Sequence, residues 1–285
     1  MSLSCLYDPR VSEEQARAGR AGIDAGATLW KLARVEADRL ELESVPAGAL
    51  TEIQERIAAW SPARIHLTGG GAARIASSLS GAPVRLISEF EAWGRGASLL
   101  ATRAGWTLPR RYLLVSVGTG TSVLEVEETV ATRVSGMTLG GGTLLGLARL
   151  LFDVESFTEI AALAEQGDRG RVDLRVGDVY PEGGIALDPR LTASCFAKAA
   201  SRDPADLAQA LVGLVGENIG LSCAALARSR GIETLVFGGS AVAASSLLGE
   251  ILRLAAQVGG AEARLLPDGA YCGAVGAAAA APAGD

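Results

Sequence analysis

The chain has 285 residues, 49% of them hydrophobic, which is enough for two modest domains or one two-lobed unit with a substantial core. Its 26 basic and 32 acidic residues give a formal net charge of −6, which argues against general nucleic-acid binding. We expect no membrane association, because we find no apolar run of spanning length and no basic run suited to an anionic surface.

The cysteines and the single histidine argue against a metal site built from them. Cys5, Cys195, Cys223 and Cys272 follow no metal-ligand spacing, so we expect reduced thiols in a cytoplasmic protein. His66 alone cannot complete a His-rich site and is expected in the core. The first residues are charged and lack an apolar segment, so we expect no signal peptide.

The first predicted hairpin is a candidate phosphate site. Its turn contains Gly26 and Thr28, and a turn of this kind can place backbone N–H groups and a hydroxyl against a phosphate. Asp24 precedes the turn, where a carboxylate can hold Mg²⁺ directly or through water. Lys31 follows it as a point charge for the same phosphate. Strands are expected over residues 21–24, 29–35 and 40–43, after a loose lead-in over residues 1–18.

Lysine usage draws further attention to this hairpin. Only two of the 26 basic residues are lysines, Lys31 and Lys198. A general preference for arginine needs no functional explanation, but one of the two lysines falls within the hairpin. An arginine is not equivalent to a compact ammonium group at such a position.

A possible general base follows in the first half. A helix is expected over residues 51–60 with Thr51 as its N-cap, and the strand 64–68 leads through glycines into a helix over 72–79. The next strand, 84–90, contains Glu89, which would point to the same side as Glu91. A carboxylate at a strand end beside a phosphate site can take a proton from an alcohol. The alternative is the acidic first turn of a helix, which favours the helix dipole.

The second half repeats the strand–hairpin pattern. Thr119, Thr121 and Ser122 lie in a second glycine/threonine hairpin, and Arg133 ends the third strand of its meander. Two glycine-rich segments, each between a strand and a helix, suit a polyphosphate. They are Gly140, Gly141 and Gly142, and later Gly238 and Gly239. The long helix over residues 207–230 is apolar on more than one face, as in a buried helix or a dimer interface.

Each half therefore reads β-β-β-α-β-α, with additions in the second half, which indicates an internal duplication. The pattern resembles the actin, sugar-kinase and Hsp70 superfamily, an actin-like (ribonuclease H-like) ATPase fold with ATP between two α/β lobes. We expect an N-terminal lobe over residues 1–108 and a C-terminal lobe over residues 109–285. No Walker A pattern occurs, and no GxGxxG follows a strand in a βαβ unit, which argues against P-loop and Rossmann folds.

Several ordered sequence blocks resemble type II pantothenate kinases. These blocks are GIDAGATLWK from Gly22, LTGGGA from Leu67, EFEA from Glu89, VGTGTS from Val117, RVSGMTLGGGTLLGL from Arg133 and GAYCGAVGA from Gly269. The resemblance covers most of the chain and implies ATP-dependent phosphorylation of pantothenate to 4′-phosphopantothenate, the first step of coenzyme A biosynthesis. It also implies a homodimer and a possible coenzyme A or acyl-CoA feedback ligand.

The resemblance also implies residue roles. Glu89 would be the general base, and Glu89, Arg133 and Asp24 would form the catalytic set with Mg²⁺ on Asp24. Pantothenate would contact Glu89, Thr119, Ser122 and Arg133. The nucleotide would contact the remaining glycines and hydroxyls together with the lysine, namely Gly26, Thr28, Lys31, Thr121, Gly140, Gly141, Gly142, Gly238 and Gly239.

Two departures from the family pattern leave alternatives open. Ala27 and Ala197 stand where relatives usually have glycine, and an alanine that needs a positive φ costs on the order of 1 kcal/mol. A kinase of the same fold could act on another small alcohol, such as an amino sugar. A non-catalytic nucleotide or acyl-CoA sensor is the third reading, which the retained Asp24, Lys31 and Glu89 disfavour.

Overall fold

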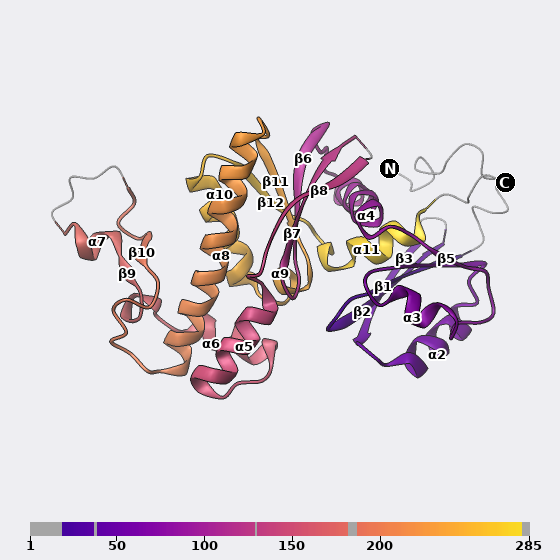
Figure 1. Ribbon diagram of the computed structural model, residues 1–285, viewed down its shortest axis with the longest axis horizontal. Helices are drawn as coiled ribbons and strands as arrows, with labels where there is room; N and C mark the ends of the chain where they lie inside the picture. Colours follow the sequence, from indigo (N-terminus) through magenta and orange to yellow (C-terminus); the bar gives the residue numbers. More distant parts are fainter. Residues whose placement is uncertain (1–18, 37–38, 129, 182–186, 281–285) are drawn as a thin grey trace.

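The structure is a computed structural model that describes residues 19–36, 39–128, 130–181 and 187–280. The expected lead-in over residues 1–18, with Cys5, lies outside them. Two five-stranded sheets organise the chain (Figure 1). The first has the order β3-β2-β1-β4-β5 and contains β1 (Arg20–Ala25), β2 (Leu29–Glu36), β3 (Arg39–Pro46), β4 (Arg64–Thr68) and β5 (Val84–Leu86). The second has the order β12-β11-β6-β7-β8 and contains β6 (Arg111–Val117), β7 (Thr121–Glu127), β8 (Val130–Met137), β11 (Thr234–Gly238) and β12 (Glu262–Leu265).

Each sheet joins an antiparallel meander to two parallel strands. In the first, β1 pairs antiparallel with β2 and parallel with β4. In the second, β6 pairs antiparallel with β7 and parallel with β11. The two halves repeat one plan, so the expected duplicated α/β architecture is confirmed. The first half carries one strand and one helix more than the expected β-β-β-α-β-α pattern, and the second half carries several more of each; β5 and β12 extend the parallel side of the two sheets.

Helices cover both faces of each sheet. On the outer face of the first sheet, Ile53, Ile57 and Trp60 of α2 (Leu50–Trp60) form the expected apolar stripe against Ile23 and Leu67. The short α3 (Ala72–Ala76) completes that layer. The outer face of the second sheet is covered by α5 (Gly141–Phe152), α6 (Phe157–Gln166), α8 (Pro204–Ser229), α9 (Ser240–Ala244) and α10 (Ser246–Val258).

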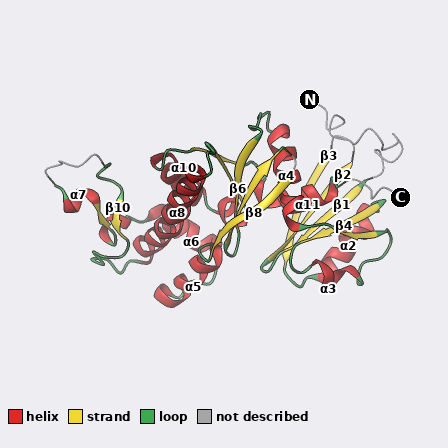
Figure 2. Ribbon diagram, turned by 45° about the horizontal axis from the view of Figure 1, so that its top comes forward, coloured by secondary structure: helices red, strands yellow, loops and turns green. Residues whose placement is uncertain are grey.

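Two helices, α4 (Glu89–Arg103) and α11 (Cys272–Ala278), lie between the sheets (Figures 1 and 2). We call them the exchanged helices, because each packs on the sheet of the other half. In α4, Gly94 lies against Ala131 of β8. In α11, the carbonyl oxygen of Ala277 lies 2.7 Å from Nδ1 of His66 in β4 and accepts a hydrogen bond from it. The expected lobe boundary at residues 108/109 falls between α4 and β6, but α11 lies against the first sheet.

The long helix α8 is buried in the second half. Among the described helices it alone is long and apolar enough, by length and composition, to cross a membrane, which departs from our expectation that no run reaches that length. However, 61% of its most apolar window is buried inside the fold, where α6 and α10 pack against it. Its position is that of a core helix, one of the two alternatives expected for this segment.

An arm projects from the second half beside α8 (Figures 1 and 2). It contains β9 (Leu174–Arg175), α7 (Val176–Val179) and β10 (Thr192–Ser194), with a 3₁₀ turn, η2 (Arg169–Arg171), at its base. Arg169 forms an ion pair with Glu217 of α8, and Lys198 lies 2.8 Å from the Asp178 carboxylate. The first contact holds the base of the arm to α8, whereas the second lies within the arm. A second 3₁₀ turn, η3 (Gly269–Tyr271), precedes α11.

Several expected boundaries were wrong. Helix α2 begins at Leu50 after Ala49, without a side-chain cap, so Thr51 is not the N-cap. Helix α3 ends at Ala76 rather than Leu79. Strand β8 continues through Met137, so Arg133 lies inside the strand rather than at its end. Hydrophobic runs mark the middle of an element better than its ends, where side-chain pattern is weakest.

Candidate active site

The turns of the two repeated hairpins meet in the cleft between the sheets. One turn joins β1 to β2 through residues 26–28, and the other joins β6 to β7 through residues 118–120. The hydroxyl oxygens of Thr28 and Thr119 lie 3.1 Å apart across this cleft. A cavity of about 290 Å³ opens beside them. Internal duplication has therefore brought two equivalent turns, far apart in sequence, to one site.

The cavity gathers most of the predicted site residues. Those that line it are Asp24, Gly26, Thr28, Lys31, Glu89, Thr119, Thr121, Ser122 and Gly239. It is also lined by residues that the sequence did not single out as site residues, namely Ala27, Leu29, Trp93, Ser116, Gly118, Gly120, Met137 and Ser240. The walls thus combine two carboxylates, one ammonium group, several hydroxyls and glycine backbone, a set suited to a polyanion and an alcohol.

Asp24 is the most constrained charged group of the site. It is only 5% exposed and pairs across the sheet with Lys31 in β2 and Thr68 in β4. Burial raises the pKa of Asp24 to about 6, with Lys31 opposing the shift and Glu89 adding to it. Within the described residues, no hydrogen bond or ion pair engages its carboxylate. A buried carboxylate without a partner, at the wall of a cavity, fits a cation ligand.

Glu89 enters the cavity from a helix rather than a strand. Strand β5 ends at Leu86, and Glu89 is the first residue of α4, so the expected strand over 84–90 was wrong at its end. Because residues two apart on a helix face different directions, Glu89 and Glu91 do not share a side. Glu91 instead forms an ion pair of 2.9 Å with Arg95. Glu89 therefore belongs to the acidic first turn of a helix and also lines the cavity, so both alternatives for this residue hold.

The three glycines 140–142 lie behind the second hairpin. The Gly141 N–H donates to the Gly118 carbonyl at 2.8 Å, and the Gly142 N–H donates to the Thr119 carbonyl at 2.9 Å. A Cβ at Gly140 would lie 2.7 Å from the Thr119 carbonyl oxygen. These three residues do not line the cavity, and two of their N–H groups are already engaged. The structure therefore gives them a supporting position, and direct contact with a nucleotide stays a prediction.

Gly238 and Gly239 have different positions, the first in a strand and the second at the cavity wall. Gly238 ends β11 and is buried, whereas Gly239 lines the cavity. Gly239 has a φ of 107°, and a Cβ there would lie 2.3 Å from the Val117 carbonyl oxygen. Only glycine combines that backbone conformation with such a close approach to β6. Gly239 thereby leads the chain from the sheet directly into α9 at the cavity wall.

Arg133 is not among the residues that line the cavity, and its side chain is exposed. Arg133 pairs with Leu124 of β7. It comes two residues after Ala131 in β8, and Ala131 contacts α4. Alternate strand residues share a face, so Arg133 lies on the α4 side of the sheet. Its guanidinium group lies against Gly136, three residues further along β8. The expected role of Arg133 in substrate binding stays a prediction.

Sequence reasoning missed Ser116, although one signal could have found it. Ser116 pairs with Ser122 at the strand end of the second hairpin, as Asp24 pairs with Lys31 in the first. Superposing the two halves would have marked Ser116 as the counterpart of Asp24. Leu29, Trp93 and Met137 are apolar and carry no such signal. Apolar cavity walls cannot be told from core residues in one sequence.

Ala27 does not carry the strain that its sequence position suggested. The described non-glycine residues with positive φ are Ser61, Glu128, Asp153, Phe196, Ala199 and Asp268, and they include neither Ala27 nor Ala197. The hairpin therefore accommodates alanine in an ordinary backbone conformation.

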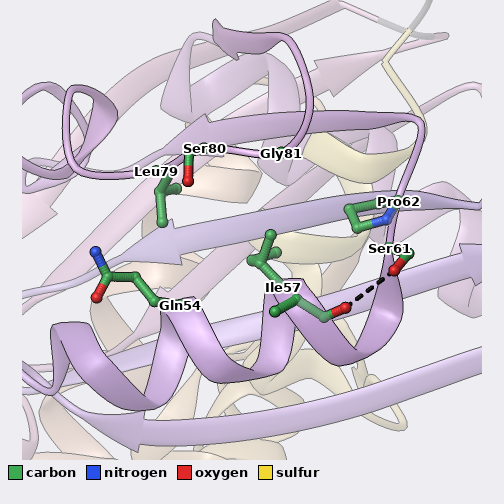
Figure 3. A pocket seen from close by; sticks show the side chains of 8 residues that line it. Gln54, Ile57, Ser61, Pro62, Leu79, Ser80 and Gly81 are labelled. Atoms are coloured by element: carbon green, nitrogen blue, oxygen red, sulfur yellow. Dashed lines mark hydrogen bonds between the residues drawn. The ribbon is translucent and has the colours of Figure 1, made fainter.

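A second cavity, of about 240 Å³, lies on the outer face of the first half (Figure 3). It is formed between α2 and the loop before β5. Gln54, Ile57, Ser61, Pro62, Leu79 and Ser80 point toward it, and its lining contains no charged side chain. With no titratable group, it cannot supply acid–base or metal chemistry. The cleft cavity, which brings Asp24, Lys31 and Glu89 together beside both repeated hairpins, is the candidate active site.

Comparison with known proteins agrees with this site. The model of the protein family described as Fumble matches residues 43–280. The chain belongs to the Fumble family. A type II pantothenate kinase from Oceanobacillus iheyensis is 34% identical over 262 residues, which cover 90% of this chain and 98% of the relative. This family membership confirms the resemblance seen in the ordered sequence blocks.

Solved structures of other proteins confirm the actin-like ATPase fold. The activator of 2-hydroxyisocaproyl-CoA dehydratase from Clostridium difficile, solved with ADPNP, matches with a TM-score of 0.59 and 15% identity over 92% of this chain and 93% of that chain. A ROK family glucokinase from Streptomyces griseus, in complex with glucose and AMPPNP, matches with a TM-score of 0.57 and 16% identity over 91% and 98%. At these identities the likeness concerns the fold alone.

Proposed function

We propose that this Fumble-family protein is a pantothenate kinase that transfers the γ-phosphoryl group of ATP to the terminal hydroxyl of pantothenate, the first step of coenzyme A biosynthesis. The product is 4′-phosphopantothenate, with ADP as the leaving group. The observation that carries the proposal is that Asp24, Lys31 and Glu89 line one cavity of a chain that belongs to this family. Phosphoryl transfer requires positioning and charge neutralisation more than covalent chemistry, and these residue types supply both.

Glu89 is the proposed general base. Its carboxylate takes the proton of the pantothenate hydroxyl as the oxygen attacks the γ-phosphorus, and the bond between that phosphorus and the β,γ-bridging oxygen breaks. Position at the start of α4 gives the base a rigid support at the cavity wall. Trp93, one helical turn later, lines the same wall and is 6% exposed. This apolar side chain limits water beside the attacking hydroxyl.

The two hairpins are proposed to hold the triphosphate. Lys31 supplies a positive charge from the first hairpin, and Thr28 and Thr119 supply hydroxyls from opposite sides of the cleft. Thr121 and Gly239 complete the proposed nucleotide contacts from the second half, whereas Ser122, together with Thr119 beside the γ-phosphate, is proposed to contact pantothenate. Arg133 is proposed to reach pantothenate from β8, since it lies on the same sheet face as α4.

Asp24 is the proposed ligand for Mg²⁺, directly or through water. The fit rests on its burial, its lack of a partner among the described residues and its position in the cavity wall. When bound, Mg²⁺ would neutralise the phosphate charge and orient the γ-phosphoryl group. Lys31, paired with Asp24 across the sheet, keeps the local charge near balance.

We further propose a cytoplasmic homodimer, with a coenzyme A or acyl-CoA thioester as a possible feedback ligand of the same cleft. Cys195, Cys223 and Cys272 are free thiols, in keeping with a reducing compartment. Leu221 of α8 is 43% exposed and offers an apolar position for a partner. The lobes over residues 1–108 and 109–285 are proposed to close around the substrates.

The test is ADP formation from ATP and Mg²⁺ with pantothenate, beside a panel of amino sugars, with the phosphorylated product identified by mass spectrometry. Turnover that depends on pantothenate supports the proposal. Turnover with an amino sugar alone would replace pantothenate by another small alcohol. Binding of ATP without turnover of any acceptor would instead indicate a nucleotide sensor.

A further inference from the structure

The Asp24 carboxylate is enclosed by two glycines from different parts of the chain. Gly69 follows β4, and a Cβ placed on it would lie 2.6 Å from Oδ1 of Asp24. Gly273 is the second residue of α11, and a Cβ there would lie 2.5 Å from Oδ2. Real Cβ atoms essentially never approach a heavy atom closer than 3.0 Å. Each carboxylate oxygen therefore rests against a glycine, one on each side.

At Gly273 the close contact involves Asp24 alone. The three atoms nearest to its Cβ position are Oδ2, Cγ and Cβ of Asp24, at 2.5, 2.7 and 3.1 Å. The space that a side chain at residue 273 would need is thus the space that the carboxylate occupies. At Gly69 the φ of +86° adds backbone strain to any substitution, so Gly273 is the cleaner of the two positions.

Backbone contacts hold helix α11 in place on both sides of Gly273. A Cβ at Gly22 would lie 2.0 Å from the Ala274 carbonyl oxygen, and one at Gly276 would lie 1.7 Å from the Ala92 carbonyl oxygen. Helix α11 is therefore in backbone contact with β1 on one side and with α4 on the other. His66 Nδ1, 2.7 Å from the Ala277 carbonyl oxygen, fixes its far end. Asp24, a side chain at the wall of a cavity, is the only flexible partner of the contact.

We infer that Gly273 is a positioning residue, which sets the orientation of the Asp24 carboxylate toward the cleft. Through this contact the last helix of the chain reaches the proposed Mg²⁺ and phosphate site of the first hairpin. The inference rests on the proposed function, since it takes Asp24 as the cation ligand. A side chain at residue 273 turns the carboxylate away while α11 and β1 stay in place.

The test compares Gly273→Ala with a control glycine far from the cleft. Gly220 of α8 is the control, because its Cβ would also meet a neighbour closely, at 2.7 Å from Ala255 Cβ. In Gly273→Ala, the dissociation constant for ATP measured by calorimetry with Mg²⁺ rises at least about tenfold, and more Mg²⁺ is needed for half-maximal binding. ATP binding measured in EDTA changes much less. Gly220→Ala lowers the melting temperature and leaves ATP binding within about twofold of the wild type.

A double variant distinguishes a displaced Asp24 carboxylate from general misfolding of Gly273→Ala. Asp24→Gly deletes the carboxylate, so adding Gly273→Ala in that background costs no further thermal stability and no further ATP affinity. Two results would overturn the inference: Mg²⁺-dependent ATP binding unchanged in Gly273→Ala, or an equal loss from Gly273→Ala with and without Asp24. These readouts need no acceptor, so they stay informative even where pantothenate turnover fails. Failure of the proposed function is therefore distinguishable from failure of this inference.

Discussion

Thr28 and Thr119 are 91 residues apart in sequence, yet their hydroxyl oxygens lie 3.1 Å from each other. Each belongs to the turn of one of the two repeated hairpins, so this contact joins the two halves at the cleft. A hydroxyl can donate or accept, so one of the two hydroxyls donates a hydrogen bond to the other. A phosphate that enters the cleft can take a hydrogen bond from both. Substitutions of these two threonines therefore test whether the cleft binds phosphate.

Thr28→Val and Thr119→Val are each expected to lower kcat/KM for ATP by roughly tenfold, because each removes one hydrogen bond to a charged group. Steady-state kinetics with varied ATP measures the effect. Thr102→Val is the control, since the Thr102 hydroxyl bonds the Ser98 carbonyl oxygen at 2.9 Å on an exposed part of α4. Unchanged kinetics in both cleft variants would show that these hydroxyls bind no phosphate.

Glu89→Gln is expected to lower kcat for pantothenate phosphorylation by about 10²–10⁴-fold, the usual worth of a positioned general base. ATP affinity should change little, because the amide keeps the size of the side chain. Rapid-quench product formation and calorimetry separate the two effects. Glu91→Gln is the matched control, since Glu91 pairs with Arg95 outside the cavity. A similar loss in both variants would point to the acidic helix start rather than to a base.

Lys31→Arg keeps the charge but should raise KM for ATP by roughly tenfold, because a planar guanidinium group does not replace a compact ammonium group. Lys31 Nζ lies beside the turn of the first hairpin, where a Cβ at Gly26 would be 3.5 Å from it. Lys198→Arg, at the only other lysine, is the control and should retain its ion pair with Asp178. Wild-type kinetics in Lys31→Arg would mean that only the charge matters.

His66 makes stability fall on acidification. It is 2% exposed, and burial, together with Arg20, Arg64 and Arg85, lowers its pKa below the ordinary 6.5. Below pH 6.5 the unfolded chain binds a proton that the folded chain does not, so this contribution to stability is present at neutral pH and lost as the pH falls.

The variant His66→Gln tests this contribution. Between pH 7.5 and 5, urea unfolding should show a steeper loss of stability in the wild type than in His66→Gln. The slope difference approaches about 1.4 kcal/mol per pH unit, the value for one proton. Equal slopes would indicate that the pKa of His66 is the same in the folded and the unfolded chain.

The duplicated architecture and most cavity residues could be predicted from the sequence, because hairpin glycines, alternating strands and ordered motif blocks are local signals. Asp24, Lys31 and Thr119 were found in this way. The end of β5 at Leu86 was missed, since the apolar run favoured a longer strand than tertiary packing allows, and the sequence left the helical position of Glu89 as one of two alternatives. The supporting place of residues 140–142 depends on contacts with a turn more than twenty residues away, which no local pattern specifies.

The contacts between the exchanged helices were not predictable either. Gly96 lies against the Cys272 carbonyl oxygen, and Gly276 lies against the Ala92 carbonyl oxygen. Small residues near the chain end indicated close packing, but not against which sheet. The partner of each glycine depends on the topology of the fold, whereas the sequence shows only that small residues occupy these positions.

The exchanged helices also bear on how the chain matures on the ribosome. The inner face of the first sheet is covered by α11, whose last residue is Ala278, close to the end of the described chain. The first half therefore cannot complete the packing on the inner face of its sheet until residues 272–278 have been synthesised, although it is made first. During translation its Asp24 side must stay open to solvent or to a chaperone. A nascent first half held on the ribosome should accordingly be cut by protease, and a peptide spanning α11 supplied in trans should protect it.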